Sequence, residues 1–145
     1  MATPAKTLYD EDFIAWTEQM ARLIENRQTD GLDWANLAEE IRDLGISKKD
    51  ALKSHLAILL MHLIKWEIQP ARRSRSWEDS ISNARTEIDM LLESHPSLKR
   101  ELSARFDATY DRARRIALRE THLSAKTPIT SWSQEQVLDH GFLPG

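Results

Sequence analysis

Residues 51–66 read Ala51-Leu-Lys-Ser-His-Leu-Ala-Ile-Leu-Leu-Met-His-Leu-Ile-Lys-Trp66, and this stretch decides the fold. From Leu56 to Ile64 the one polar side chain is His62. A helix that is apolar on nearly every side must be covered by protein or by membrane. The apolar run is shorter than the roughly 20 residues that cross a bilayer. The sequence therefore predicts the central helix of a helical bundle, with two histidines in its wall.

The composition of the whole chain favours one all-α domain. The chain has 145 residues, of which 41% are apolar and 30% are charged. These fractions are ordinary for a charge-rich globular protein of single-domain length. Four glycines and five prolines leave little material for hairpin turns. The absence of cysteine excludes disulfides, thiolate metal sites and cysteine nucleophiles, and it fits a cytoplasmic protein. The first ten residues have no apolar core, so we expect neither a signal peptide nor a membrane anchor.

The apolar periodicity predicts about five helices in one domain over residues 9–145, after a flexible leader over residues 1–8. A first amphipathic helix opens near Tyr9 and ends near Arg27, before a turn at residues 29–31. Asp33 is a candidate N-cap for a short second helix that ends at Gly45 as its C′ residue. The predicted buried seam of this second helix consists of Trp34, Leu37, Ile41 and Leu44.

The remaining helices follow from caps and breakers. Ser47 can cap the central helix, and Pro70 stops it after about residue 67. The segment Ser76-Trp-Glu-Asp79 resembles a capping box at the start of a fourth helix. A fifth helix follows Pro96, which suits a first helical turn. The tail after residue 123 carries large apolar residues, so we expect it to dock on the bundle and to be ordered to about residue 143.

Charge is distributed unevenly along the chain. Residues 1–45 hold 10 acidic and 4 basic side chains, whereas residues 46–75 hold 2 acidic and 7 basic ones. One interpretation is that the acidic part packs near the basic middle within the fold. The other is that the basic middle forms a local anion-binding surface.

Several short segments, taken together, follow the pattern of a known family. They are Tyr9-Asp-Glu-Asp-Phe13, Ala15-Trp16, Leu32-Asp-Trp34, Leu37-Ala-Glu-Glu-Ile41, His55-Leu56, His62-Leu-Ile-Lys-Trp66, Gln69-Pro70, Arg73-Ser-Arg-Ser-Trp77, Pro96-Ser-Leu98, Trp132, Gln136-Val-Leu-Asp139 and Phe142-Leu-Pro144. The sequence resembles the bacterial "domain of unknown function 29" family over about residues 9–144. The resemblance implies a small, all-helical bacterial protein, but it supplies no activity and no catalytic residue. Ile64 and Glu67-Ile68 depart from the leucine and the aromatic residue that the family pattern leads us to expect.

The two histidines of the central helix raise the question of a metal site. His55 and His62 are seven residues apart, which separates them by roughly 10 Å along a helix. Two helical histidines that share one ion are usually three or four residues apart. One of them could join Glu39 or Glu40 from the preceding helix, but no Glu-x-x-His pair is present. A structural His–Glu hydrogen bond between the two helices is the favoured interpretation.

A second cluster lies between the central and fourth helices. Arginines, hydroxyls and tryptophans gather where a helix begins, an arrangement that could bind phosphate or carboxylate. Because the whole chain is acidic, it lacks the broad basic face of a nucleic-acid-binding domain. The alternative is that the tryptophans are core residues and the arginines form ion pairs. The candidate ligand-binding residues are Lys65, Trp66, Arg72, Arg73, Arg75, Ser76 and Trp77.

Motifs of nucleophilic catalysis and nucleotide binding are missing from the sequence. There is no Gly-x-Ser-x-Gly elbow and no glycine-rich phosphate loop. We therefore expect a non-enzymatic protein-interaction module, without a cofactor, that binds another protein or a second copy of itself. Anion binding through residues 72–77 and a metal-dependent enzyme built on the histidines are the alternatives.

Overall fold

The computed structural model describes residues 7–145, and the fold is all-α as expected. Within that range there are six α-helices, two short 3₁₀ helices and no strand. Most of the predicted leader, residues 1–6, lies outside the described residues, and Leu8 already begins the first helix. The chain divides into an N-terminal unit that ends at Ile46 and a C-terminal unit, Ser47–Gly145. The single domain expected over residues 9–145 stays a prediction, and each unit is described by itself.

The N-terminal unit contains a short helix, α1 (Leu8–Glu11), and a longer one, α2 (Phe13–Glu25). The side chain of Asp12 caps α2 by accepting a hydrogen bond of 3.0 Å from the backbone N–H of Ala15. Helix α2 ends in a Schellman motif, in which the N–H of Gln28 donates to the carbonyl of Leu23. Arg27 supplies the left-handed residue of this motif, with φ of 58°. The 3₁₀ turn η1 (Thr29–Gly31) then leads to α3 (Trp34–Ile68).

The prediction of a helix boundary at Gly45 and Ser47 was wrong. Helix α3 is continuous over 35 residues and includes both positions. A glycine inside a helix costs only about 1 kcal/mol relative to alanine. Ending one helix and starting another would leave four carbonyls and four N–H groups without helical partners. One glycine is therefore too weak a signal to end the helix.

The seam predicted for the second helix was also wrong about burial. Trp34, Ile41 and Leu44 are 64%, 66% and 70% exposed. Among residues 7–46, the buried apolar side chains are Trp16 and Met20, both on α2. The described part of this unit has no further long helix that could cover the seam, so the apolar spacing does not lead to burial.

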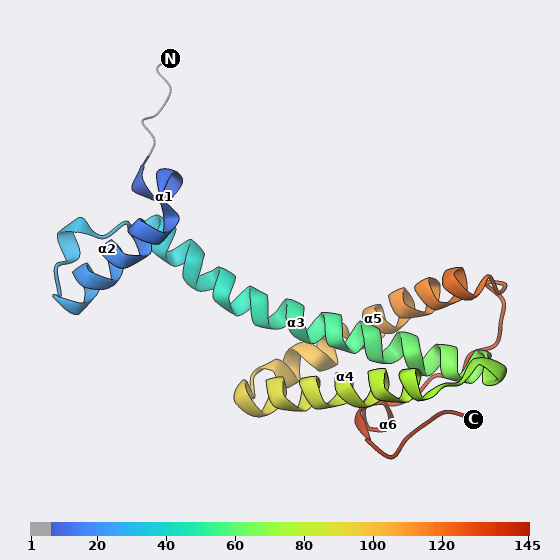
Figure 1. The fold of residues 1–145 in the computed structure, drawn as a ribbon. Coiled ribbons are helices and arrows are strands. Elements are labelled where there is room, and N and C mark those ends of the chain that lie inside the picture. Colours follow the sequence, from blue (N-terminus) through green and yellow to red (C-terminus); the bar gives the residue numbers. More distant parts are fainter. Residues whose placement is uncertain (1–6) are drawn as a thin grey trace. The chain divides into compact units, whose positions relative to one another are not determined.

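The C-terminal unit surrounds the second part of α3, as the sequence predicted. Helices α4 (Arg75–Ser94) and α5 (Leu98–Thr121) lie alongside it, after the short η2 turn (Pro70–Arg72) (Figure 1). Five large aliphatic side chains of α3 are at most 1% exposed and form the centre of the core. They are Leu56, Leu59, Leu60, Leu63 and Ile64.

The start of α4 differs from the predicted capping box. Ser74, not Ser76, is the N-cap, and its hydroxyl accepts a 3.2 Å hydrogen bond from the N–H of Trp77. Ser76 is the second residue of the helix and is exposed. Two serines two residues apart both fit an N-cap pattern, and the chain uses the earlier one.

A buried arginine holds the C-terminal tail against the core. Helix α6 (Gln134–Leu138) places Val137 in the core, and Arg85 of α4 is only 2% exposed beneath it. The Nε–H of Arg85 donates to the carbonyl of Val137, and an Nη2–H donates to the carbonyl of Phe142, both at 2.8 Å. Burial lowers the pKa of Arg85, an effect that the charge of Asp139 partly offsets. The tail is thus fixed by charge-assisted hydrogen bonds to its backbone.

No helix among residues 7–145 has both the length and the apolar character needed to cross a membrane. Even the 35-residue α3 carries charged side chains along much of its length.

Replacing Arg85 by methionine should destabilise the C-terminal unit by roughly 2–4 kcal/mol. Methionine replaces the aliphatic stem of arginine but not its guanidinium. It leaves the buried carbonyl of Val137 and the partly buried carbonyl of Phe142 without donors, at about 1–3 kcal/mol each. Urea unfolding measures the change. The matched control is Arg100→Met on the exposed face of α5. Equal stability of the two variants would show that the Arg85 hydrogen bonds do not hold the tail.

Candidate functional site

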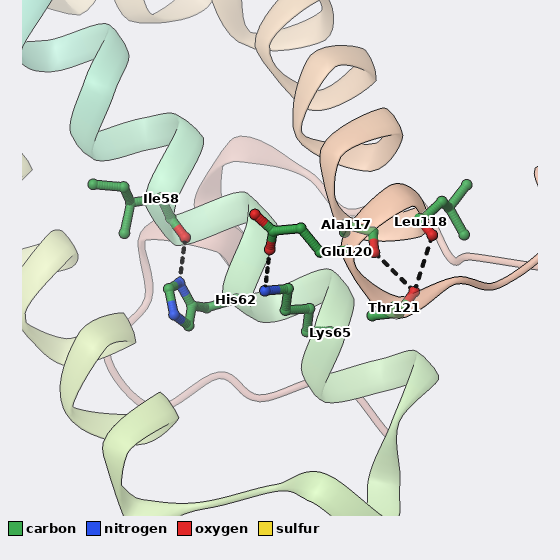
Figure 2. A network of polar contacts seen from close by, with 7 residues as sticks. All are labelled: Ile58, His62, Lys65, Ala117, Leu118, Glu120 and Thr121. Carbon is green, nitrogen blue, oxygen red and sulfur yellow. Dashed lines mark hydrogen bonds and ion pairs between the residues drawn. The ribbon is translucent and has the colours of Figure 1, made fainter.

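One of the two histidines of α3, His62, is hydrogen-bonded within its own helix. The Nδ1–H of His62 donates to the carbonyl oxygen of Ile58, one turn earlier, at 2.9 Å (Figure 2). His55 and His62 are both half-buried. The side chain of His62 therefore already has a partner for one of its ring nitrogens.

The predicted His–Glu link between two helices was wrong, because Glu39, Glu40, His55 and His62 lie on one continuous helix. Side chains that touch along a helix are three or four residues apart, and these pairs are much farther apart in sequence. Glu40 instead accepts a hydrogen bond from the hydroxyl of Tyr9. Among residues 7–145, no group of three or more histidine or carboxylate side chains is placed to hold a metal ion.

The arginine segment is partly used for structure. The Nε–H of Arg73 donates to the carbonyl of Trp66 at 2.8 Å, and its guanidinium lies 5.1 Å from the centre of the Trp66 ring. The same guanidinium also donates to the backbone oxygens of Pro144 and Gly145, at 3.4 Å. Trp66 is buried and Trp77 packs against the core. Arg73 and both tryptophans are therefore parts of the packed unit.

The other candidate cations of this segment form fewer hydrogen bonds to the protein than Arg73 does. Lys65 forms an ion pair with Glu120 at the end of α5 (Figure 2). This hydrogen bond holds the pKa of the Glu120 carboxyl below its ordinary value. Arg72 and Arg75 are exposed, and Arg72 lines a cavity of about 200 Å³ together with Lys65 and Glu120. The carboxylate of Glu120 inside this cavity weakens its attraction for an anion.

A largely apolar concave surface lies in the N-terminal unit and is called here the apolar groove. Its volume is about 690 Å³, within the usual range of ligand sites. It runs between the end of α2, the η1 turn and the start of α3. Its apolar lining consists of Leu23, Ile24, Leu32, Trp34, Leu37, Ala38 and Ile41.

Asp33 fixes the two helices that form the apolar groove. Its carboxylate caps α3 by accepting a hydrogen bond of 3.4 Å from the N–H of Asn36, as the sequence predicted. It also accepts a bond of 3.2 Å from the indole Nε1–H of Trp16 on α2. The hydrogen bond from the Asn36 side chain is the main reason that the pKa of Asp33 is lowered. One carboxylate thus sets both the start of α3 and its position against α2.

The apolar groove was missed from the sequence, although its signal is present. Trp34, Leu37, Ile41 and Leu44 have the three-and-four spacing of a helical packing face. That spacing shows that the face is suited to packing on another element. It does not show whether that element belongs to the same unit.

The contact between Tyr9 and Glu40 should appear in an alkaline titration. The hydrogen bond to Glu40 is the largest cause that raises the pKa of Tyr9 from 10.0 to about 12. A raised pKa in the folded state means that the stabilisation is complete below pH 10 and is lost as the pH rises towards 12.

Ultraviolet difference titration measures this pKa once Tyr110, the other tyrosine, is replaced by phenylalanine. We expect a midpoint near 12 for Tyr9 and a lower midpoint in the Glu40→Gln variant. Glu39→Gln is the matched control and should change the midpoint less, because Tyr9 bonds to Glu40. A midpoint that is the same with Gln or Glu at position 40 would contradict the assigned contact.

Comparison with known proteins gives a family but no function. No curated protein and no solved structure matches the chain. One family model matches residues 8–143, which covers both units and almost the whole sequence. The chain therefore belongs to the family described as "Domain of unknown function DUF29", as its sequence pattern led us to expect.

Proposed function

We propose that this chain is a cytoplasmic, non-enzymatic protein-interaction module, and that its apolar groove receives an amphipathic helix rich in lysine and arginine. The observation that carries the proposal is the exposure of the apolar seam at the start of α3. Soluble proteins rarely leave a contiguous apolar surface uncovered unless it binds something. The following points support this occupant.

The geometry of the seam fits a helix. Trp34, Leu37, Ile41 and Leu44 follow a heptad-like spacing, which presents one stripe to a partner helix. A partner would use apolar residues at matching three-and-four positions, as in helix-in-groove recognition. Covering one large aliphatic side chain contributes about 1.5–3 kcal/mol. Ile24, Ile41 and Leu44 are all more than half exposed. A partner that covers them would therefore gain a substantial binding free energy from apolar burial.

The charge of the N-terminal unit indicates a basic partner. Between residues 7 and 46 there are ten acidic and three basic side chains. A partner with positive charge beside its apolar stripe gains electrostatic complementarity and faster association. Two copies of this unit that met face to face would bring two acidic surfaces together, which favours a different partner over a homodimer.

The other functions considered from the sequence have less support. Arg73 already donates a hydrogen bond to the backbone carbonyl of Trp66. The negative charge of Glu120 lies in the same cavity as Lys65 and Arg72, which disfavours anion binding there. The histidines meet no carboxylate group within the described residues that could complete a metal site. A binding role for the N-terminal unit uses apolar side chains, such as Trp34 and Ile41, that are exposed in the part of the chain that the structure describes.

A pair of designed peptides tests the proposal. The first is a three-heptad amphipathic helix with leucine on one face and lysine on the other, and the second has glutamate in place of each lysine. We expect the lysine peptide to bind the full chain in calorimetry and the glutamate peptide to bind at least tenfold more weakly. Ile41→Ser should weaken binding of the lysine peptide about tenfold or more, since it removes one anchor worth more than 1.4 kcal/mol.

The matched control is Met90→Ser, which removes an exposed apolar side chain from α4 of the other unit. Binding that is equal in the Ile41 and Met90 variants would overturn the proposed site. Light scattering of the unbound chain is the second readout. A dimer that dissociates in the Ile41→Ser variant would instead assign the apolar groove to a second copy of the chain.

A further inference from the structure

A second concave surface lies in the C-terminal unit, between α3 and α5, and has the opposite character. Two adjoining cavities of about 440 and 370 Å³ share Lys53, Thr109 and Arg112 in their walls. Arg115 lines the larger cavity. We call this surface the basic groove and define it by Lys53, Thr109, Arg112 and Arg115.

The basic groove exists because small side chains line facing helices. Ala104 and Ala108 of α5 and Ala57 of α3 form parts of its walls. Residues three or four apart lie on one face of a helix, so Ala104, Ala108, Arg112 and Arg115 share one side of α5. The hydroxyl of Thr109 donates to the carbonyl of Arg105 at 2.7 Å and is satisfied within the helix. The floor of the basic groove thus consists of small side chains, and its walls carry long cationic ones.

The carboxylates that line the basic groove offset only part of its positive charge. Four cationic side chains line the two cavities, against two carboxylates, Glu101 and Asp50. Glu101 lines the larger cavity, but it is paired with Arg105 at 3.1 Å and with Lys49 at 3.3 Å. Hydrogen bonds from Arg105 and Lys49 lower the pKa of Glu101, so this carboxylate is ionised and committed to those partners. Asp50 lines the smaller cavity. Among residues 7–145, no ion pair involves Lys53, Arg112 or Arg115.

Lys53, Arg112 and Arg115 around one concave surface favour a polyvalent anion. Arginine offers planar N–H groups that fit two oxygens of a phosphate, and lysine adds a mobile point charge. Arg112 and Arg115 are separated by about 4.5 Å along the helix axis, a spacing suited to neighbouring phosphate groups. No aromatic side chain lines either cavity, so nothing there would stack on a nucleobase.

We infer that the basic groove binds a small molecule with two or more phosphate groups, held by Lys53, Arg112 and Arg115. A single-stranded nucleic acid fits less well, because the chain as a whole has a net charge of -3 and this basic surface is short. This site is separate from the arginine segment at residues 72–77 and does not depend on the proposed peptide-binding role.

Calorimetric titration of the full chain with inorganic pyrophosphate and with orthophosphate tests the inference. We expect saturable 1:1 binding of pyrophosphate, at least tenfold tighter than that of orthophosphate, and weaker binding as salt rises. Amide shifts in NMR should be largest around Lys53, Thr109 and Arg112. Equal affinity for the two ions, or no saturable binding, would overturn the inference.

A double variant with a matched control locates the site. Arg112→Gln with Arg115→Gln removes two exposed charges from the basic groove and should weaken pyrophosphate binding at least tenfold. Arg100→Gln with Arg119→Gln removes two exposed charges from the same helix outside the groove and should change binding less than twofold. Equal losses in both double variants would show a general charge effect and no site. Tighter binding of a single-stranded oligonucleotide or of a polyglutamate peptide than of pyrophosphate would overturn the small-ligand assignment.

Discussion

The fold of the C-terminal unit depends on burial of the second part of α3. Leu56, Leu59, Leu60, Leu63 and Ile64 point in several directions around the helix, yet each is at most 1% exposed. Fully burying one such side chain contributes about 1.5–3 kcal/mol. No single neighbour can cover a helix that is apolar all round, so α4, α5 and the tail each cover part of it.

The tail completes that cover, and a charged group fixes it in place. The backbone of the tail is largely irregular, so its carbonyls have no helical donors, and Arg85 supplies two. Trp132 and Phe142 add edge-on aromatic packing, with ring centres 6.1 Å apart. Burying a charged arginine is costly unless its hydrogen bonds are satisfied, and here the tail satisfies them. The tail carbonyls thus gain hydrogen-bond donors, and the buried guanidinium of Arg85 gains acceptors.

The two units differ in how much of its own apolar surface each one buries. The C-terminal unit closes a core and leaves a groove lined by cations, whereas the N-terminal unit buries two large residues and leaves an apolar seam exposed. The two proposed sites follow from this difference. An acidic unit with an apolar seam suits a basic helix, and a groove lined by Lys53, Arg112 and Arg115 suits a compact polyanion.

The sequence by itself determined the all-α class, the buried part of α3 and the cap at Asp33, because these depend on local spacing and local hydrogen bonds. It predicted a helix end at Gly45, because glycine is common just after a helix, but one glycine inside a helix costs only about 1 kcal/mol, less than a helix boundary would. It could not show that the seam at Ile41 is exposed. The apolar spacing identifies a packing face of the helix, but it does not identify the element that covers this face. Only the tertiary structure brings Lys53 of α3 beside Arg112 of α5, and Arg85 beside the carbonyl of Val137. Contacts between residues far apart in the chain leave no local pattern in the sequence. The apolar groove and the basic groove could therefore be located only from the structure.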